Sequence, residues 1–458
     1  MSFATRLQEH GDRIALILES GEAVSYGALA SLSDSTFAAE NAPRGGGVLI
    51  AVECRNGLAS VAGYLGALRH RYPVLLVDAK QPTELRERLY THFQIAYVLS
   101  DDGTWRHTGH IGPTVHPDVT VLLSTSGSTG SSKLVRLSDS AVSANALSIA
   151  QYLALDSSER PVTTLPMHYA YGLSVLNSHF AVGATILLTS LPVIAPPFWS
   201  FFREHQATSL SGVPETYNML KQLRFERMDL PSLRTMTQAG GRLTPTLVQW
   251  FGELAADRGW CFVVMYGQTE ATARISFVPP ARVLEKTDSI GVAIPGGTLD
   301  ILDSKGEVIE GNGVTGELRY RGPNVMMGYA SNVADLTLPD TQDGMLRTGD
   351  LAWRDSDSYF HIVGRLQRFI KVFGNRLGLD DIEMQLHESG YDAAVTGRDD
   401  LLLIAIKGQG VDTESILSMV SGRYRLPRSA ILVVSVDNLP RSSAGKILYS
   451  ELLEQLTF

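Results

Sequence analysis

Short apolar runs alternate with longer stretches of mixed polarity along most of the chain. The runs at 48–52, 74–77, 119–123, 185–188 and 262–265 are built mainly from Val, Ile, Leu and Ala. Runs that are apolar on both faces are typical of strands covered on both sides, and the helical patterns between them supply the cover. The pattern therefore predicts an α/β protein with helices packed on its sheets.

After residue 364 the same pattern restarts on a smaller scale. Apolar runs at 401–406 and 430–434 predict two strands, and the segment 414–424 between them has a helical pattern. Together these elements predict a compact α+β unit in the last part of the chain.

The stretch 180–202 contains no charged residue and is long enough to cross a membrane. Gly183 and three prolines interrupt it, and the segment 184–189 has the pattern of a buried strand followed by a loop. We therefore expect no membrane span here.

Composition narrows the class of protein. The chain has 458 residues, 44% of them hydrophobic, which is enough for more than one domain and a substantial core. Its formal net charge of −9 argues against a nucleic-acid-binding surface. The two cysteines, Cys54 and Cys261, have no clustered partners, so neither a disulfide framework nor a zinc site is predicted. We expect the protein in the reducing cytoplasm.

The apolar run at 119–123 leads into a loop made almost entirely of Ser, Thr and Gly. Glycines let backbone N–H groups approach an anion, hydroxyls add donors, and a lysine adds positive charge. The loop therefore predicts a phosphate site, and a nucleoside triphosphate is the expected ligand. Its residues are Ser124, Thr125, Ser126, Gly127, Ser128, Thr129, Gly130 and Lys133.

Two common phosphate-binding motifs do not match this loop. The Walker motif needs four residues between its glycines, whereas two separate Gly127 from Gly130. A dinucleotide-binding fingerprint needs a third glycine where Ser132 stands. Taken alone, the loop leaves a solvated Ser/Gly linker open as an alternative.

Four further motifs follow in a fixed order and favour the phosphate-binding loop over the linker. They are YGQTE at 266–270, RTGD at 347–350, GRLQRFIK at 364–371 and PRSSAGK at 440–446. With the phosphate loop, this series resembles the adenylate-forming superfamily, which includes acyl- and aryl-CoA synthetases, the adenylation domains of nonribosomal peptide synthetases, and firefly luciferase. Several motifs in the right order are far more specific than any one of them.

The resemblance implies two domains and a reaction. Residues 1–365 would bind ATP and the acid, and residues 366–458 would form a small mobile α+β lid. The implied reaction joins a carboxylic acid to AMP, releases pyrophosphate, and passes the acyl group to a thiol. A compact, stand-alone acyl or aryl acid ligase is expected, with coenzyme A as the first choice of acceptor and a carrier protein's phosphopantetheine arm as the alternative.

A protein of another class, which uses this fold only to bind a ligand, is a further alternative. Such a protein would be expected to lose the charged positions of the motifs. Lys446, Glu270, Asp350 and Arg365 are all present, which favours the enzyme.

By resemblance, three residues carry the chemistry of adenylation. Lys446 would bridge the substrate carboxylate and the α-phosphate, where negative charge gathers in the transition state. Thr269 would bond the α-phosphate, and Glu270 would hold Mg²⁺, a cation that prefers carboxylate and phosphate oxygens.

The resemblance also implies residues that bind ATP beyond the phosphate loop. Asp350 would accept both ribose hydroxyls, since a carboxylate offers two acceptor oxygens. Arg365 would contact the ribose or phosphates. The glycines Gly240 and Gly241 would line the adenine and acyl pockets, and Tyr266 and Gly267 would complete the nucleotide site.

The second half of the reaction involves the lid. The hinge position of the family is occupied here by Gln367, which is unusual, but hinges absorb backbone change and need no particular side chain. Lys371 and Gly374 keep the family pattern beside the expected tunnel for the thiol.

The acid pocket is implied by the segment 166–173, where His168, Tyr169 and Gly172 are the candidate residues. Members that activate amino acids place an aspartate where Tyr169 stands here. Because a buried ammonium group without a counter-charge is costly, α-amino acids are disfavoured and an uncharged acyl or aryl tail is preferred. The sequence leaves the choice between an aliphatic and an aromatic acid open.

Overall fold

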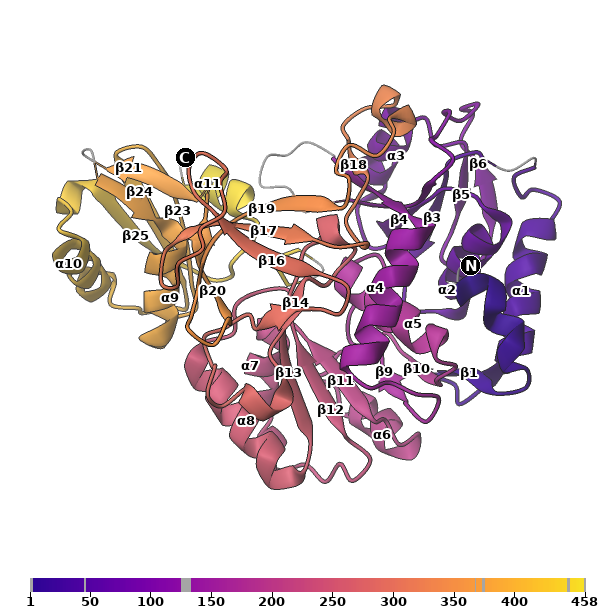
Figure 1. Cartoon of the computed structure of the whole chain (residues 1–458), viewed down its shortest axis with the longest axis horizontal. Coiled ribbons are helices and arrows are strands. Elements are labelled where there is room, and N and C mark those ends of the chain that lie inside the picture. The colour runs from indigo at the N-terminus through magenta and orange to yellow at the C-terminus, as the bar shows by residue number, and fades with distance from the viewer. Residues whose placement is uncertain are drawn as a thin grey trace.

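The structure is a computed structural model that describes residues 3–44, 47–124, 133–366, 368–372, 375–442 and 445–456. Figure 1 shows a large body and, beside it, a smaller C-terminal lobe. The body contains two large sheets with helices between and around them, so the predicted α/β class is confirmed.

The first large sheet has seven strands, and the strands at its centre run parallel. Antiparallel strands close both of its edges. In spatial order the strands are β18 (Gly328–Ala330), β8 (Leu134–Ser138), β7 (Val119–Ser124), β4 (Val74–Asp78), β3 (Ile50–Cys54), β5 (Tyr97–Leu99) and β6 (Trp105–His107).

The second large sheet has nine strands and is also parallel at its centre. In spatial order the strands are β15 (Val292–Ala293), β14 (Ser276–Phe277), β13 (Cys261–Tyr266), β12 (Thr235–Gln238), β11 (Ser209–Gly212), β9 (Pro161–Val162), β10 (Ile186–Leu188), β1 (Ile14–Leu18) and β2 (Ala23–Ser25).

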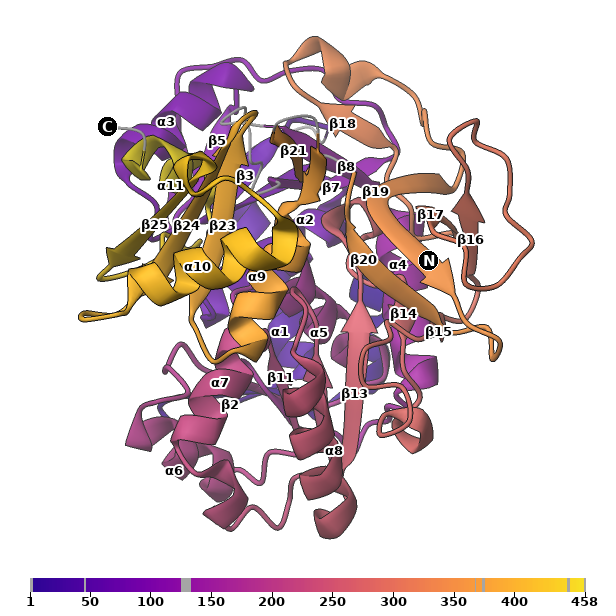
Figure 2. The ribbon, with the colours of Figure 1, turned by 90° about the vertical axis from the view of Figure 1, so that its left-hand side faces the viewer.

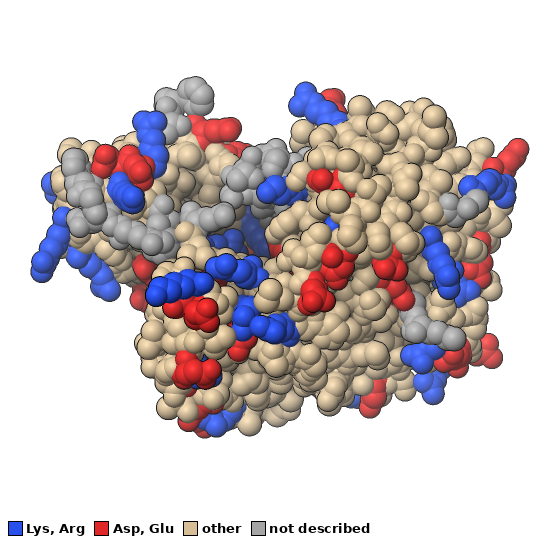
Figure 3. All heavy atoms as spheres, turned by 45° about the horizontal axis from the view of Figure 1, so that its top comes forward, with Lys and Arg blue, Asp and Glu red and all other residues tan. Residues whose placement is uncertain are grey.

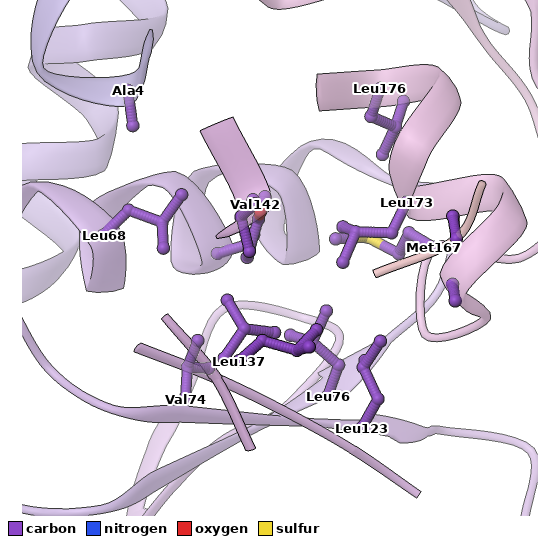
Figure 4. Packing of buried hydrophobic residues seen from close by; sticks show 14 of the residues in the cluster. Ala4, Leu68, Val74, Leu76, Leu123, Leu137, Val142, Met167, Leu173 and Leu176 are labelled. Atoms are coloured by element: carbon purple, nitrogen blue, oxygen red, sulfur yellow. The ribbon is translucent and has the colours of Figure 1, made fainter. Parts of the chain in front are cut away.

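The main core lies between these two sheets. It joins Leu76 of β4 and Ile186 of β10 to apolar side chains of α2 (Leu58–His70), α4 (Asp139–Tyr152) and α5 (Ala170–Ala181). Figure 4 shows Leu68, Val142, Leu173 and Leu176 of these helices facing Val74, Leu76, Leu123 and Leu137 of the seven-stranded sheet. Each fully buried leucine contributes about 2 kcal/mol to this packing.

Helix ends in the body follow local rules. Ser25 begins α1 (Tyr26–Ala38) by accepting a hydrogen bond from the backbone N–H of Ala28 at 3.1 Å. Ser138 does the same for α4, with Ala141 as donor at 3.1 Å. Such caps stabilise a helix by about 1 kcal/mol because they satisfy otherwise unpaired N–H groups.

A second core covers the other face of the nine-stranded sheet. It is rich in aromatic side chains and packs under α6 (Pro196–Glu204), α7 (Pro214–Gln222) and α8 (Pro245–Arg258). Helix α6 lies in the uncharged stretch 180–202, where the sequence predicted only a strand and a loop. Its prolines favour the start of a helix. The backbone N–H groups of the first turn have no partner within the helix, so proline, which lacks this group, loses no hydrogen bond there. Within the described ranges, no helix is long and apolar enough to span a bilayer.

A third sheet joins the body to the lobe. It is antiparallel and consists of β16 (Thr298–Leu302), β17 (Gly316–Arg321), β19 (Met345–Arg354) and β20 (Phe360–Arg365). In Figure 1 these strands lie between the body and the C-terminal lobe.

The C-terminal lobe has its own apolar core, which includes Ile382, Val395, Ile404 and Val420. The predicted strands at 401–406 and 430–434 and the predicted helix at 414–424 are confirmed. The elements are β21 (Phe369–Val372), β22 (Asn375–Gly378), α9 (Leu379–Glu388), β23 (Ala393–Arg398), β24 (Leu401–Lys407), α10 (Thr413–Tyr424), β25 (Ile431–Val436) and α11 (Tyr449–Leu456).

Candidate active site

Residues of the four motifs meet where the lobe faces the body. Strand β13 ends at Tyr266, and the short helix η3 (Thr269–Ala271) follows it directly. Strand pairing between β19 and β20 sets Asp350 opposite Arg365. In Figure 2, where the lobe faces the viewer, α9 lies in front of the body, and it contacts β20. The carboxyl ends of sheet strands are where open α/β folds bind ligands.

Asp350 is a buried residue at the centre of a hydrogen-bond network whose other members are partly or largely exposed. Only 3% of the residue is exposed. One carboxylate oxygen accepts a hydrogen bond from Arg365 Nε at 3.0 Å, and the other accepts from Gln268 Nε2 at 3.0 Å and from the Tyr266 hydroxyl. Burial and the Asp350 charge raise the pKa of Tyr266 well above its usual value, so Tyr266 stays a hydrogen-bond donor.

Further hydrogen bonds hold the residues of this network in place. Gln268 also donates to the Thr348 carbonyl at 2.9 Å, and the Thr348 hydroxyl accepts from the Asp350 N–H at 3.1 Å. Sequence reasoning did not single out Gln268 or Thr348. Both stand inside the motifs at 266–270 and 347–350, which was the signal that could have identified them.

Gly267 sits at a point of close backbone approach. A Cβ atom at this position would come 1.8 Å from the Ala273 carbonyl oxygen. The glycine therefore lets the loop after β13 fold back on itself and set Gln268 and Thr269 beside the network.

Lys446 reaches this region from the lobe. Burial is the largest cause that lowers its pKa, and the nearby Arg365 charge lowers it further, while Glu270 and Asp350 oppose the shift. Its Nζ atom lies 5.3 Å from the centre of the Tyr169 ring. Lys446 precedes α11 in the chain. Because its ammonium group lies over the Tyr169 ring of the body, it differs from an ordinary surface lysine at a helix start.

The turn that carries Lys446 is held by local bonds. The Lys446 N–H donates to the Ser442 hydroxyl at 3.2 Å, and the Ser442 N–H donates to the Lys446 carbonyl at 2.8 Å. Gly445 has φ +77°, a left-handed conformation that suits glycine. Arg441 donates to the Gly445 carbonyl at 3.1 Å and pairs with Glu215 of α7 at 3.9 Å, which ties the turn to the body.

Glu270 and the ends of the phosphate loop lie near one another. Glu270 accepts a hydrogen bond from the Tyr329 hydroxyl at 2.8 Å, and Lys133 Nζ lies 5.7 Å from the centre of the Tyr329 ring. Ser124 ends β7 and pairs with the first residue of β8, so the two ends of the loop are adjacent. The predicted loop residues Thr125, Ser126, Gly127, Ser128, Thr129 and Gly130 lie outside the described residues.

The residues around Glu270 fit a magnesium ion that is shared with ATP. Across the described ranges, no group of three or more His, Cys, Asp or Glu side chains could enclose a metal. Mg²⁺ usually takes one or two carboxylates and completes its octahedron with phosphate oxygens and water. A lone carboxylate beside a phosphate loop matches that preference.

Tyr169 and Gly240 form the boundary of the predicted acid pocket. Gly240 has φ +83°, and a Cβ atom there would come 2.5 Å from the Tyr169 hydroxyl. Gly241 packs on Pro214, since its added Cβ would stand 3.0 Å from the proline ring. Gly172 lies in the first turn of α5, where a Cβ would stand 2.3 Å from the Pro166 carbonyl. Helix packing alone therefore explains Gly172.

His168 lies beside β4. Its Nε2 atom is 3.6 Å from the Asp78 carboxylate, and burial is the main cause that lowers its pKa. The structure therefore favours a neutral, packed imidazole at the edge of the predicted acid pocket.

Two of the predicted lid residues, Gln367 and Gly374, lie outside the described residues. Lys371 lies in β21 with an exposed side chain, and its N–H donates to the Asp399 carboxylate at 2.9 Å. Its placement beside a thiol tunnel stays a prediction.

Arg368 organises the start of the lobe, and sequence reasoning did not identify it. Its guanidinium pairs with Asp380 at 2.6 Å and Glu383 at 3.3 Å, and lies 3.6 Å from the centre of the Tyr449 ring. Asp380 also accepts from the Arg365 N–H at 3.1 Å. The signals that could have identified it are its place in the motif at 364–371 and the pair of acidic residues, Asp380 and Glu383, three positions apart in the sequence.

Several known proteins are similar to this chain. A family model described as AMP-binding enzyme matches residues 105–330. An indoleacetate–CoA ligase of Aromatoleum aromaticum is 30% identical over 73% of this chain and 67% of that protein. A feruloyl-CoA synthase of an Amycolatopsis species is 31% identical over 73% of this chain and 69% of that protein.

A solved structure shows the same fold over nearly the whole chain. The O-succinylbenzoate coenzyme A synthetase of Bacillus subtilis, solved in complex with AMP, superposes with a TM-score of 0.81. The match covers 98% of both chains at 22% sequence identity.

Proposed function

Because the chain belongs to the AMP-binding enzyme family, we propose that it is an AMP-forming acid–thiol ligase. In the first step a carboxylate oxygen of the acid attacks the α-phosphorus of ATP, and pyrophosphate leaves. In the second step the sulfur of coenzyme A attacks the acyl carbonyl and loses its proton, and AMP leaves. The observation that carries this proposal is Lys446, whose Nζ lies over the Tyr169 ring and feels the charges of Arg365, Glu270 and Asp350.

Lys446 is the proposed donor for the first step. The acid and the triphosphate repel each other, and charge develops on the oxygens of the α-phosphate in the transition state. A buried ammonium group that is already in place offsets this charge without reorganisation of water. Thr269, at the start of η3, would add a hydroxyl donor to the same phosphate.

Asp350 is the proposed ribose ligand. Its two oxygens offer about four lone-pair positions, and Tyr266, Gln268 and Arg365 take three of them, so one is open to a ribose hydroxyl and the second hydroxyl would displace one of these donors. Gly240 and Gly241 would leave room for a flat adenine ring. Glu270 would hold Mg²⁺, which supplies positive charge to the β- and γ-phosphates when ATP is bound.

Coenzyme A is the proposed acceptor, as in the relatives named for CoA ligation. A carrier protein's phosphopantetheine arm, the alternative, would need a surface on the lobe. On the face shown in Figure 3, basic and acidic side chains are interspersed. Arg428 pairs with Glu414 and Arg441 with Asp392, so these arginines are less available to phosphates or to an acidic carrier helix.

We also propose that the chain divides into two domains, residues 1–365 and 366–458, and that the protein is located in the cytoplasm.

The test is acid-dependent release of pyrophosphate from MgATP across aliphatic, aryl and amino acids, with and without coenzyme A. We expect release with an acyl or aryl acid, loss of release when magnesium is chelated, and faster turnover with coenzyme A. If release occurs only when a carrier protein with a free phosphopantetheine thiol is present, that carrier replaces coenzyme A as the acceptor. No release with any acid would overturn the ligase and favour a binding protein.

A further inference from the structure

A buried arginine stands behind the proposed acid pocket without a counter-charge. Arg274 lies between η3 and β14, and only 2% of it is exposed. No Asp or Glu of the described residues comes within 4.0 Å of its guanidinium nitrogens, and its Nε–H has no hydrogen-bond partner there. Taking a guanidinium out of water costs several kcal/mol unless an anion meets it.

The neighbours of Arg274 offset this cost only in part. Its guanidinium carbon lies 3.9 Å from the centre of the Tyr171 ring, and it contacts the Tyr152 hydroxyl. A desolvated cation–π contact contributes about 2 kcal/mol, and a neutral hydroxyl supplies no charge. Tyr171 itself is fixed, because its hydroxyl donates to the Thr237 carbonyl at 2.8 Å.

Arg274 faces an enclosed cavity of about 20 Å³. Val175, Leu153 and Ile149 form its apolar side, and hydroxyls of Ser211 and Thr237 form its polar side. This volume holds one water-sized group, so it could take one oxygen of a substrate's far end and not a whole acid.

The other titratable group at the cavity carries no charge at neutral pH. Burial lowers the pKa of His179 to about 4, and its Nδ1–H donates to the Val175 carbonyl at 2.7 Å. Among the described lining residues, Arg274 is therefore the one cation. The cavity favours a ligand with negative charge.

A series of side-chain contacts connects Arg274 with Lys446. Lys446 Nζ stands over the Tyr169 ring, the Tyr169 and Tyr171 rings meet edge to face at 6.4 Å, and Arg274 covers Tyr171. An acid with its reacting carboxylate at Lys446 would pass these two rings before its far end met Arg274.

We propose that the acid substrate carries a second anionic group, a carboxylate, and that Arg274 binds it. The unpartnered Nε–H and the adjacent Nη–H of a guanidinium match the two oxygens of a carboxylate in a bidentate pair. This proposal rests on the proposed ligase function. It also revises the uncharged tail that the sequence favoured, since that argument considered only the position of Tyr169.

The test compares pairs of acids that differ only at the far end, such as terephthalate with 4-carbamoylbenzoate, and linear dicarboxylates with their monoamides. Pyrophosphate release gives kcat/KM for each member. We expect the wild-type enzyme to favour the dicarboxylate of its best pair by about 100-fold, because truncating a buried charge pair costs 2–5 kcal/mol. In Arg274→Met this ratio should fall to about one, and Arg274→Lys should restore part of it.

Other outcomes separate the two proposals. A wild-type preference for the amide members, or a loss in Arg274→Met that is equal for both members, would overturn the second anion and leave the ligase intact. If no acid supports pyrophosphate release, the ligase fails, and calorimetric binding of the dicarboxylates still decides the role of Arg274. Binding that Arg274→Met abolishes and Arg274→Lys retains would support it, and binding equal in all three proteins would overturn it.

Discussion

The body half and the lobe half of the site are held by different kinds of contact. In the body, Asp350 is buried and shared by Tyr266, Gln268 and Arg365 on neighbouring strand ends. One contact of the lobe with the body is the Arg441–Glu215 ion pair at 3.9 Å, whose side chains are about 30% exposed. Buried networks are rigid, whereas exposed ion pairs contribute little.

This difference indicates how the two steps share one site. The nucleotide half is fixed before ATP arrives. Lys446, in contrast, is carried by a turn of the lobe, and the proposed departure of the lobe after adenylation would break the Arg441–Glu215 pair and the Arg365–Asp380 hydrogen bond.

Breaking the body half should abolish most ATP binding. In Asp350→Asn the amide would turn an N–H₂ group toward the Tyr266 and Gln268 donors and would remove the charge beside Arg365. Hydrogen bonds to a charged group contribute about 1.5–3 kcal/mol each, so we expect KM for ATP to rise about 100-fold. Initial rates of pyrophosphate release measure this, and Asp343→Asn, on the exposed loop before β19, is the matched control. An unchanged KM would remove Asp350 from the nucleotide site.

Breaking the ion-pair cluster inside the lobe should reduce the stability of the lobe. Arg368→Met leaves Asp380 and Glu383, both largely buried, without their cation. Removing one partner of a buried pair costs about 3 kcal/mol. Urea unfolding of the full chain should then show an earlier transition, whereas Arg398→Met, an exposed change at the end of β23, should not. Equal midpoints for both variants would contradict the cluster's role.

The charge on Lys446 gives the adenylation step a pH dependence. Burial and Arg365 hold the Lys446 pKa below the usual lysine value. The protonated form is the active one, so kcat/KM for adenylation should fall as pH rises through that lowered pKa. In Lys446→Arg the guanidinium stays charged, and the decline should move to higher pH. An identical decline in both proteins would assign the titration to another group.

Weakening the contact between the halves should have the smallest effect. Glu215→Gln removes the partner of Arg441 on the body, and exposed pairs contribute only about 0.2–1 kcal/mol. We expect adenylation to slow by about two- to threefold, with a loss that shrinks at high salt. Glu226→Gln, at an exposed site remote from the lobe contact, is the control. A tenfold loss would show that the pair is a principal contact.

The predictability of the fold differs from that of the site. The strand at 74–77 could be predicted because four adjacent apolar residues are buried on both faces, and the helix at 414–424 because its apolar residues recur on one side. Helix α6 was missed because its adjacent prolines are also typical of a loop. Only the packing of the neighbouring core in the folded protein shows that the aromatic face of α6 is buried.

Within the site, motifs predicted what local sequence can encode. Tyr266, Asp350 and Lys446 stand in recognisable runs, and the structure brings their side chains into one region, although their roles stay predictions. Arg274 lies outside these runs, and Arg368 lies within the run at 364–371, which does not by itself indicate what its side chain contacts. Their significance comes from partners that are distant in sequence, or from the lack of a counter-charge among the described residues, and both require tertiary structure.

Separating the two half-reactions of Lys446→Ala tests the account most directly. Pyrophosphate release from ATP and the accepted acid is measured first, and thioester formation from supplied acyl-AMP and coenzyme A second, with Lys407→Ala in the lobe as the control. The account predicts that Lys446→Ala loses the first reaction by about 100-fold or more and keeps the second. Adenylate formation at the wild-type rate, together with slow thioester formation, would contradict it.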